Sequence, residues 1–172
     1  MKKLLLSFLA IVMVASFSNQ VAAQATASAT ATATIVAPIA IASDVQMNFG
    51  NVAVDGTVGT AELAPAGTRN ATGGVQFVAT SGTVTAASFN VTGEGTYTYA
   101  ITLPSGDAYI ITDPVSNQTM IVNAFTSTPS ATGALTAGAQ TLLVGATLNV
   151  KTTTVAGVYT NATGFDVTVN YN

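Results

Sequence analysis

Residues 25–41 read ATASATATATIVAPIAI, and this stretch decides which kind of fold the chain can adopt. Its first ten residues alternate Ala with Thr or Ser, and the remainder is apolar. Thr, Val and Ile are β-branched, which restricts their χ1 angle and favours an extended strand over a helix. We therefore predict an extended N-terminal arm over residues 24–41, whose backbone must pair with another strand.

The side chains of this arm fall into two phases, because successive residues of a strand point to opposite faces. One phase carries Thr and Ser, and the other carries small or aliphatic side chains. Pro38 lacks an N–H and belongs at a sheet edge or a bulge, where it separates the arm from the domain that follows. The arm is either the first strand of its own sandwich or a strand donated to another copy, and we favour donation. The predicted donor positions are Ala31, Ala33, Ile35, Ala37, Ile39 and Ile41.

Residues 1–23 have the three parts of a secretion signal. Lys2 and Lys3 are basic, residues 4–14 are almost all apolar, and Val21-Ala22-Ala23 supplies small residues for cleavage. The apolar part is shorter than the ~20 residues that a membrane-spanning helix needs. We therefore predict a signal peptide over residues 1–23, passage through the periplasm, and a final place on the cell surface or outside the cell. No membrane span is expected after cleavage.

Charged residues make up only 6% of the chain, and neither Cys nor His occurs. Without the signal, Arg69 and Lys151 are the only basic residues against seven acidic ones, so the net charge is −5. This charge argues against nucleic-acid binding, which needs a basic surface. The absence of His and Cys removes Ser-His and Cys-His catalysis and the usual transition-metal sites. We therefore predict no enzymatic activity, no metal and no bound cofactor.

The rest of the chain predicts an all-β fold. Thr, Ala, Val and Gly are abundant, whereas the Glu, Lys and Arg that usually cover helix surfaces are rare. Many short alternating stretches bounded by Gly, Pro, Asn and Asp are typical of a sandwich or a barrel, and we predict an immunoglobulin-like antiparallel β-sandwich over residues 42–172. The expected strands are residues 45–49, 57–63, 74–79, 83–92, 96–103, 109–112, 118–125 and 141–150, and a last strand that carries Phe165, Val167, Val169 and Tyr171.

Three stretches resemble a family of secreted bacterial proteins of unknown function. They are ATATATIVAPIAI with MNFGNVAV, ASFNVTGEGTYTYAITLP, and GVYTNATGFDVTVNYN. In outline they are also similar to spore coat protein U-like proteins and to pilins of the archaic chaperone–usher class. The resemblance implies a sandwich that lacks one strand, which a periplasmic chaperone supplies first and the arm of the next subunit then replaces. It also implies a C-terminal assembly strand marked by Gly157, Phe165, Val167, Val169 and Tyr171.

The expected function is that of a structural subunit of a bacterial surface or pilus-like assembly that polymerises by donor-strand exchange. A missing strand leaves an apolar groove bordered by unpaired N–H and C=O groups, and such an edge accepts another strand. Head-to-tail donation between copies does not close on itself and builds a filament. A periplasmic chaperone and an outer-membrane usher are the expected partners of this homo-oligomer.

The alternative function is that of a monomeric secreted binding or adhesion module for a carbohydrate or another surface ligand. Such a module would present coplanar, solvent-facing aromatic rings. The chain has five Tyr and no Trp, so the placement of the tyrosines distinguishes the two functions.

Overall fold

The computed structural model describes residues 24–80, 82–107 and 109–172, so the predicted signal peptide lies outside the described residues. The chain divides into two units, Met1–Ile35 and Val36–Asn172. In the first unit, residues 24–35 contain no helix or strand, and all their side chains are exposed. We call residues 24–35 the leading segment. Every described strand belongs to the second unit, which begins at Val36, so residues 36–41 of the predicted arm belong with the sandwich.

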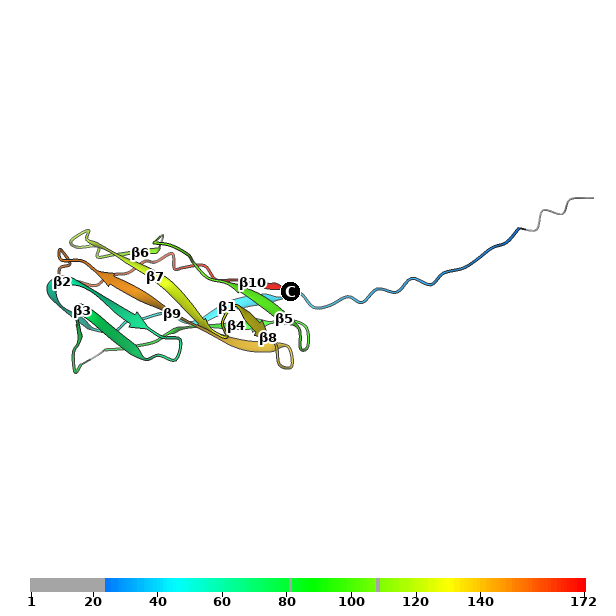
Figure 1. The fold of residues 1–172 in the computed structure, drawn as a ribbon, viewed down its shortest axis with the longest axis horizontal. Coiled ribbons are helices and arrows are strands. Elements are labelled where there is room, and N and C mark those ends of the chain that lie inside the picture. The colour runs from blue at the N-terminus through cyan, green and yellow to red at the C-terminus, as the bar shows by residue number, and fades with distance from the viewer. Residues whose placement is uncertain (1–23, 81, 108) are drawn as a thin grey trace, which may run out of the picture. The chain divides into compact units, whose positions relative to one another are not determined.

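The second unit is an all-β fold of two antiparallel sheets, which confirms the predicted antiparallel β-sandwich (Figure 1). The smaller sheet contains β5 (Thr98–Thr102), β8 (Thr132–Ala134) and β10 (Thr168–Tyr171) in the order β10-β5-β8. The larger sheet contains β1 (Ala40–Val45), β2 (Val52–Leu63), β3 (Arg69–Phe77), β4 (Ala87–Thr92), β6 (Tyr109–Thr112), β7 (Thr119–Thr128) and β9 (Ala139–Val150).

The long strand β9 organises the larger sheet. Leu148 of β9 pairs with Ala61 of β2 on one side and with Val122 of β7 on the other. The first half of β9 pairs with β4, so β4 and β2 occupy successive stretches of one edge and β7 occupies the opposite edge. The alternating pattern predicted for this segment places one phase of β9 in the core. The buried residues of that phase are Leu142, Val144, Ala146, Leu148 and Val150.

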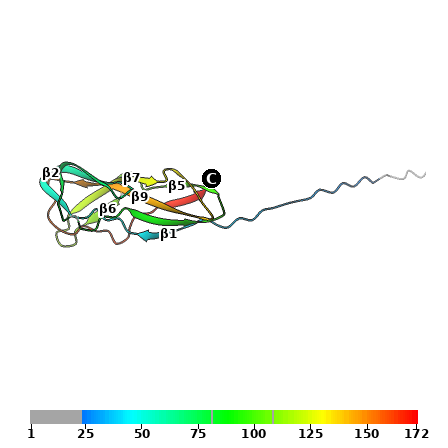
Figure 2. The same cartoon turned by 90° about the horizontal axis from the view of Figure 1, so that it is seen from below.

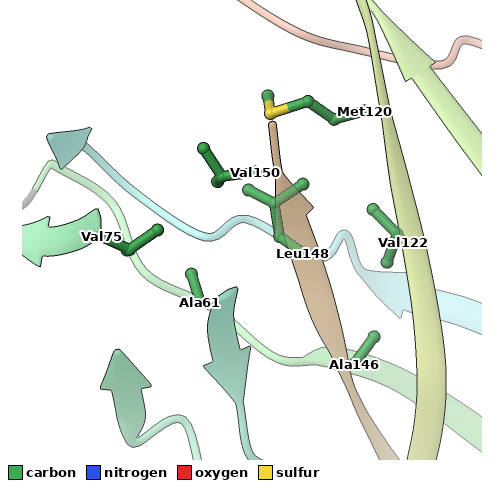
Figure 3. Close-up of a cluster of buried hydrophobic side chains, with 7 residues drawn as sticks. All are labelled: Ala61, Val75, Met120, Val122, Ala146, Leu148 and Val150. Carbon is green, nitrogen blue, oxygen red and sulfur yellow. The ribbon is translucent and has the colours of Figure 1, made fainter. Parts of the chain in front are cut away.

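The core consists of two clusters of buried apolar side chains. The first cluster is built from β2, β3, β7 and β9 (Figure 3), and its residues are Ala61, Val75, Met120, Val122, Ala146, Leu148 and Val150. The second cluster joins the two sheets, because it contains Leu142 of β9 together with Tyr99 of β5 and Val169 of β10. Sheets that pack face to face over such a cluster form a sandwich.

The start of the sandwich differs from the prediction. A strand was expected over residues 45–49, but β1 ends at Val45, and residues 46–51 contain only an isolated bridge between Asn48 and Thr85. The hydrophobic pattern of MNFGNV suits either arrangement, since Met47 and Phe49 pack against the core without a ladder. The strand that pairs with β4 therefore consists of residues 40–45, and residues 46–51 are not part of it.

The sequence pattern also missed the last three residues of β7 and all of β8. The pairing of β7 with β9 shifts between Asn123 and Thr126, and Ala124 has a φ of 48°. This one-residue bulge exchanges the two faces of the strand. Before the bulge, Val122 faces the core, and after it, the odd-numbered Phe125 does. Alternation is therefore interrupted within the strand, and the residues beyond Phe125 were predicted to form a loop.

The strands that matter for the site gather at one end of the sandwich. Figures 1 and 2 place the C-terminus at the end of β10, close to β5, whereas β2 and β6 lie toward the opposite end. The elements β1 and β10 also contact each other, although they belong to different sheets. This end therefore holds the first and the last strand of the compact unit.

Candidate functional site at the β1–β10 seam

Strands β1 and β10 each have one edge that no other described strand occupies. β1 pairs only with β4, from Ala40 opposite Thr92 to Val45 opposite Ser88. β10 pairs only with β5. We call these two strands, with the half-buried side chains of Ile39, Ile41, Phe89, Phe165 and Val167, the β1–β10 seam. An unpaired strand edge offers a row of N–H and C=O groups to which another strand can add.

The C-terminal segment supplies one side of the seam. Phe165, Val167, Val169 and Tyr171 alternate along the chain, and all four pack with the second core cluster. Val169 is 8% exposed, whereas the other three are half-buried. The ladder begins only at Thr168, three residues later than the alternation predicts. Phe165 and Val167 therefore pack by their side chains alone.

Phe165 lies at the centre of a cluster of aromatic rings. Its ring centroid is 6.1 Å from that of Phe89, 5.5 Å from that of Tyr109 and 4.9 Å from that of Phe125. The contacts with Phe89 and Tyr109 are edge to face, the arrangement that the ring quadrupole favours. All four rings are only half-buried. The seam thus keeps a large aromatic surface partly open to solvent.

The predicted donor positions separate into two groups. Ile39 and Ile41 are half-buried against the second core cluster, on the same side of β1. Ala31, Ala33 and Ile35 lie in the leading segment and in no strand, and the Ile35 side chain is 95% exposed. All these residues share one strand phase. In that phase, the residues from position 39 onward face the core, and the earlier ones remain in solvent.

Ala37 is held by a hydrogen-bonded arrangement that the sequence did not predict. Its N–H donates to Glu94 Oε2 at 2.9 Å, and its C=O accepts a hydrogen bond from the Tyr171 hydroxyl at 2.9 Å. The same hydroxyl accepts a hydrogen bond from the Glu94 N–H at 2.6 Å. The position of Glu94 between two glycines marks a turn in the sequence, and nothing in that pattern points to Ala37 or Tyr171.

Gly157 does not lie with the other predicted assembly residues. It is exposed in the loop between β9 and β10, where an added Cβ would lie 2.7 Å from Asp113 Oδ2. Asp113 is buried in the loop between β6 and β7 and accepts hydrogen bonds from the Ser116 hydroxyl and from the N–H groups of Ser116 and Val115. These bonds, led by that of the Ser116 side chain, lower the pKa of Asp113. Gly157 thus allows close packing around this carboxylate.

The tyrosines do not form a flat exposed platform. Tyr99 is fully buried, and its burial raises the pKa of its hydroxyl. Tyr97 is 46% exposed, but it meets Tyr171 edge to face, with 75° between the ring planes. Tyr109 packs against Phe125 and Phe165. Tyr97, Tyr99, Tyr109 and Tyr171 therefore do not form the coplanar, solvent-facing set of rings that was expected for the alternative function.

A shallow hollow over the outer face of β1, β4 and β9 is lined mainly by small polar side chains, with Asp44 as its one charged residue. Within the described ranges, no group of three or more Asp or Glu residues lies close enough to hold a metal ion. A search of the same ranges found no helix with the length and hydropathy needed to cross a membrane.

The fold and the seam define the class: an all-β protein of two antiparallel sheets whose first and last strands carry unpaired edges. The chain belongs to the family described as "Domain of unknown function (DUF4402)", whose family model matches residues 39–171. The matched region contains both strands of the seam and leaves out the leading segment. Neither the curated proteins nor the solved structures contained a match to the chain.

Proposed function

We propose that this protein is a structural subunit of a bacterial cell-surface or pilus-like assembly. In this assembly the leading segment of one copy pairs with the β1–β10 seam of the next copy. The sandwich is then an immunoglobulin-like fold that is completed in trans, and a periplasmic chaperone and an outer-membrane usher are its partners during export. One observation carries the proposal: the chain combines a segment patterned as a strand but in no strand with a sandwich whose first and last strands, in contact with each other, each have one unpaired edge.

The lengths of the two parts support this pairing. An extended segment rises about 3.3 Å per residue, so residues 24–35 would span about 40 Å. The strands of the seam are shorter, since β1 contains six residues and β10 contains four. A donated segment over residues 24–35 is therefore long enough to pair along either strand.

The side chains of the leading segment also suit close approach to a strand edge. Its apolar phase consists of alanines and ends in Ile35, whereas its other phase is hydroxylated between Thr26 and Thr34. Small side chains let the donated backbone approach the edges closely, and the Thr and Ser phase remains in solvent. Ile35 is the one large apolar side chain that donation would bury.

The free energy of donation comes from the ladder and from Ile35. Full burial of an Ile side chain contributes ~1.5–3 kcal/mol. Each net backbone hydrogen bond contributes ~0.5–1.5 kcal/mol, and a ladder repeats this term along the strand. Ile35 is 95% exposed in the single copy, so its contribution becomes available only when a partner covers it. Because each copy both gives and accepts a strand, the assembly grows head to tail.

Deletion of residues 24–35 tests the proposal. We expect the mature chain to form a ladder of multimers on unboiled gels and in size-exclusion chromatography with light scattering. The deletion variant should be folded and monomeric, because the compact unit begins at Val36. Multimers that persist without residues 24–35 would overturn strand donation.

A matched control separates the pattern of the segment from its composition. The double variant Thr34→Ile/Ile35→Thr keeps every residue type but moves the Ile to the other strand face. Since a one-residue shift exchanges the two faces of a strand, we expect the multimers to be lost. As a direct measurement, a synthetic peptide of residues 24–36 should bind the deletion variant and raise its Tm, whereas the exchanged peptide should not. An equal effect of both peptides would contradict the proposal.

A further inference from the structure

We infer that Ala37, Glu94 and Tyr171 form a clasp that positions the start of β1 against the end of β10 and thereby fixes one end of the seam. Three hydrogen bonds of 2.6–2.9 Å join these residues, which are far apart in the sequence. All three hydrogen bonds lie within the compact unit. Only the effect of the clasp on assembly rests on the proposed function.

The clasp ends the ladder of β1 on its N-terminal side. Both backbone polar groups of Ala37 are bound by the clasp, and Pro38 has no N–H to donate. The partner strand ends as well, since β4 stops at Thr92, the residue opposite Ala40. Neither Ala37 nor Pro38 therefore has a free N–H with which to extend the β1–β4 pairing.

The Tyr171 hydroxyl connects three elements through one oxygen atom. It donates to the Ala37 carbonyl before β1 and accepts from the Glu94 N–H in the turn between β4 and β5, while its ring belongs to β10. A tyrosine hydroxyl has one proton to donate and lone pairs to accept, so both roles are satisfied together. Phenylalanine at this position would keep the ring and lose both hydrogen bonds.

The surroundings of Tyr171 leave its side chain little freedom. Gly93 lies so close that an added Cβ would overlap the Tyr171 hydroxyl. The ring of Tyr97 packs against that of Tyr171 with 5.6 Å between the centroids. The clasp therefore depends on a glycine at position 93. A strand that adds along the seam runs as far as the clasp and no farther, which sets the register of the added strand.

Amide hydrogen exchange of the full mature chain tests the clasp. In Tyr171→Phe, the N–H of Glu94 loses its acceptor, and we expect it to exchange about fivefold to tenfold faster. Glu94→Ala should have the same effect on the N–H of Ala37, whereas Glu94→Gln keeps an acceptor oxygen and should largely restore protection. The core amide of Val91 reports that each variant remains folded.

Two further variants keep this test independent of general destabilisation. Tyr97→Phe removes a neighbouring hydroxyl outside the clasp and should leave the exchange of Ala37 and Glu94 unchanged. Gly93→Ala should reproduce the effect of Tyr171→Phe, because its Cβ displaces the hydroxyl. Equal exchange in Tyr171→Phe, Tyr97→Phe and the parent chain would overturn the clasp, even if the multimers persist. Absence of multimers in the parent chain would instead contradict the proposed function and leave the exchange result intact.

Discussion

The leading segment and β1 share one alternating pattern, yet only β1 is a strand. Ile41 of β1 lies opposite Val91 of β4 and packs against the core, whereas Ile35, six residues earlier in the same phase, is 95% exposed. Both regions contain β-branched residues, which favour extended backbone, beside alanines, which do not. The difference is that β4 ends opposite Ala40, so the residues before it have no strand alongside. Strand propensity selects the conformation, and a partner edge decides whether a strand forms.

The largest expected effect is the difference in free energy of unfolding between an Asp placed on the core face of β1 and an Asp placed on its exposed face. Ile41→Asp places an unpaired charge against the second core cluster, and we expect the free energy of unfolding to fall by about 3 kcal/mol. The neighbouring Ala42→Asp lies on the exposed face and should change it by less than about 0.5 kcal/mol. Urea unfolding of both variants measures the contrast. Similar midpoints for the two variants would show that β1 is not docked through Ile41.

Truncation of the two isoleucines should then distinguish folding from assembly. Ile41→Ala should lower the free energy of unfolding by about 2 kcal/mol, because its side chain packs in the core. Ile35→Ala should leave the unfolding of the monomer unchanged, since the side chain is exposed there. Burial of Ile35 in a partner would make this variant assemble about tenfold more weakly. Analytical ultracentrifugation measures the second effect, and an unaltered association constant would remove Ile35 from the interface.

Acid should lower the free energy of unfolding of the compact unit, and the leading segment should not contribute to this change. The pKa of Asp113 is lowered from its ordinary value of 3.8 by hydrogen bonds from the Ser116 side chain and backbone. A lowered pKa in the folded state stabilises the fold above the unfolded value. This stabilisation therefore decreases as the pH falls below about 3.8 and is lost once the pH passes through the lower folded value.

The variant Asp113→Asn measures the contribution of Asp113 to this loss of stability in acid, which is the smallest of the expected effects. Residues 24–35 contain no titratable side chain, so unfolding curves between pH 6 and pH 2 should have the same pH dependence with and without them. Asp113→Asn should flatten the acid limb in both backgrounds. A change in pH dependence on deletion of residues 24–35 would show that the segment interacts with titratable groups of the compact unit.

The phases of the regular strands were predictable, because alternation is local information, but β2 and β3 each begin five residues earlier than predicted. The phases of β9 and of the C-terminal residues from Phe165 to Tyr171 follow directly from the sequence. The bulge at Ala124 was not predictable, since a single left-handed residue reverses the phase and leaves no compositional mark. β8 is only three residues long and lies in a stretch rich in Ser, Thr, Pro and Gly, which is typical of loops.

The candidate site was predictable only in part. Alternation identified Phe165, Val167, Val169 and Tyr171 as one phase, and the four do pack together. The contact of Tyr171 with Glu94 and Ala37 depends on how three segments distant in sequence meet in the fold. A local sequence pattern does not predict such a contact. Gly157 was assigned from the resemblance alone, and its neighbour proved to be Asp113. Local patterns thus gave the faces of the strands and missed the polar contacts between them.

The hydrogen bond between Ala37 and Tyr171 places the two ends of the compact unit next to each other. A short flexible linker from Asn172 to Val36 is therefore able to close the unit into a ring without disturbing either sheet. New termini opened in an exposed loop, such as residues 151–153, would then give a circular permutant with the same core. An affinity tag added after Asn172 would emerge beside Ala37, so a tag in that loop is the better choice for assembly assays.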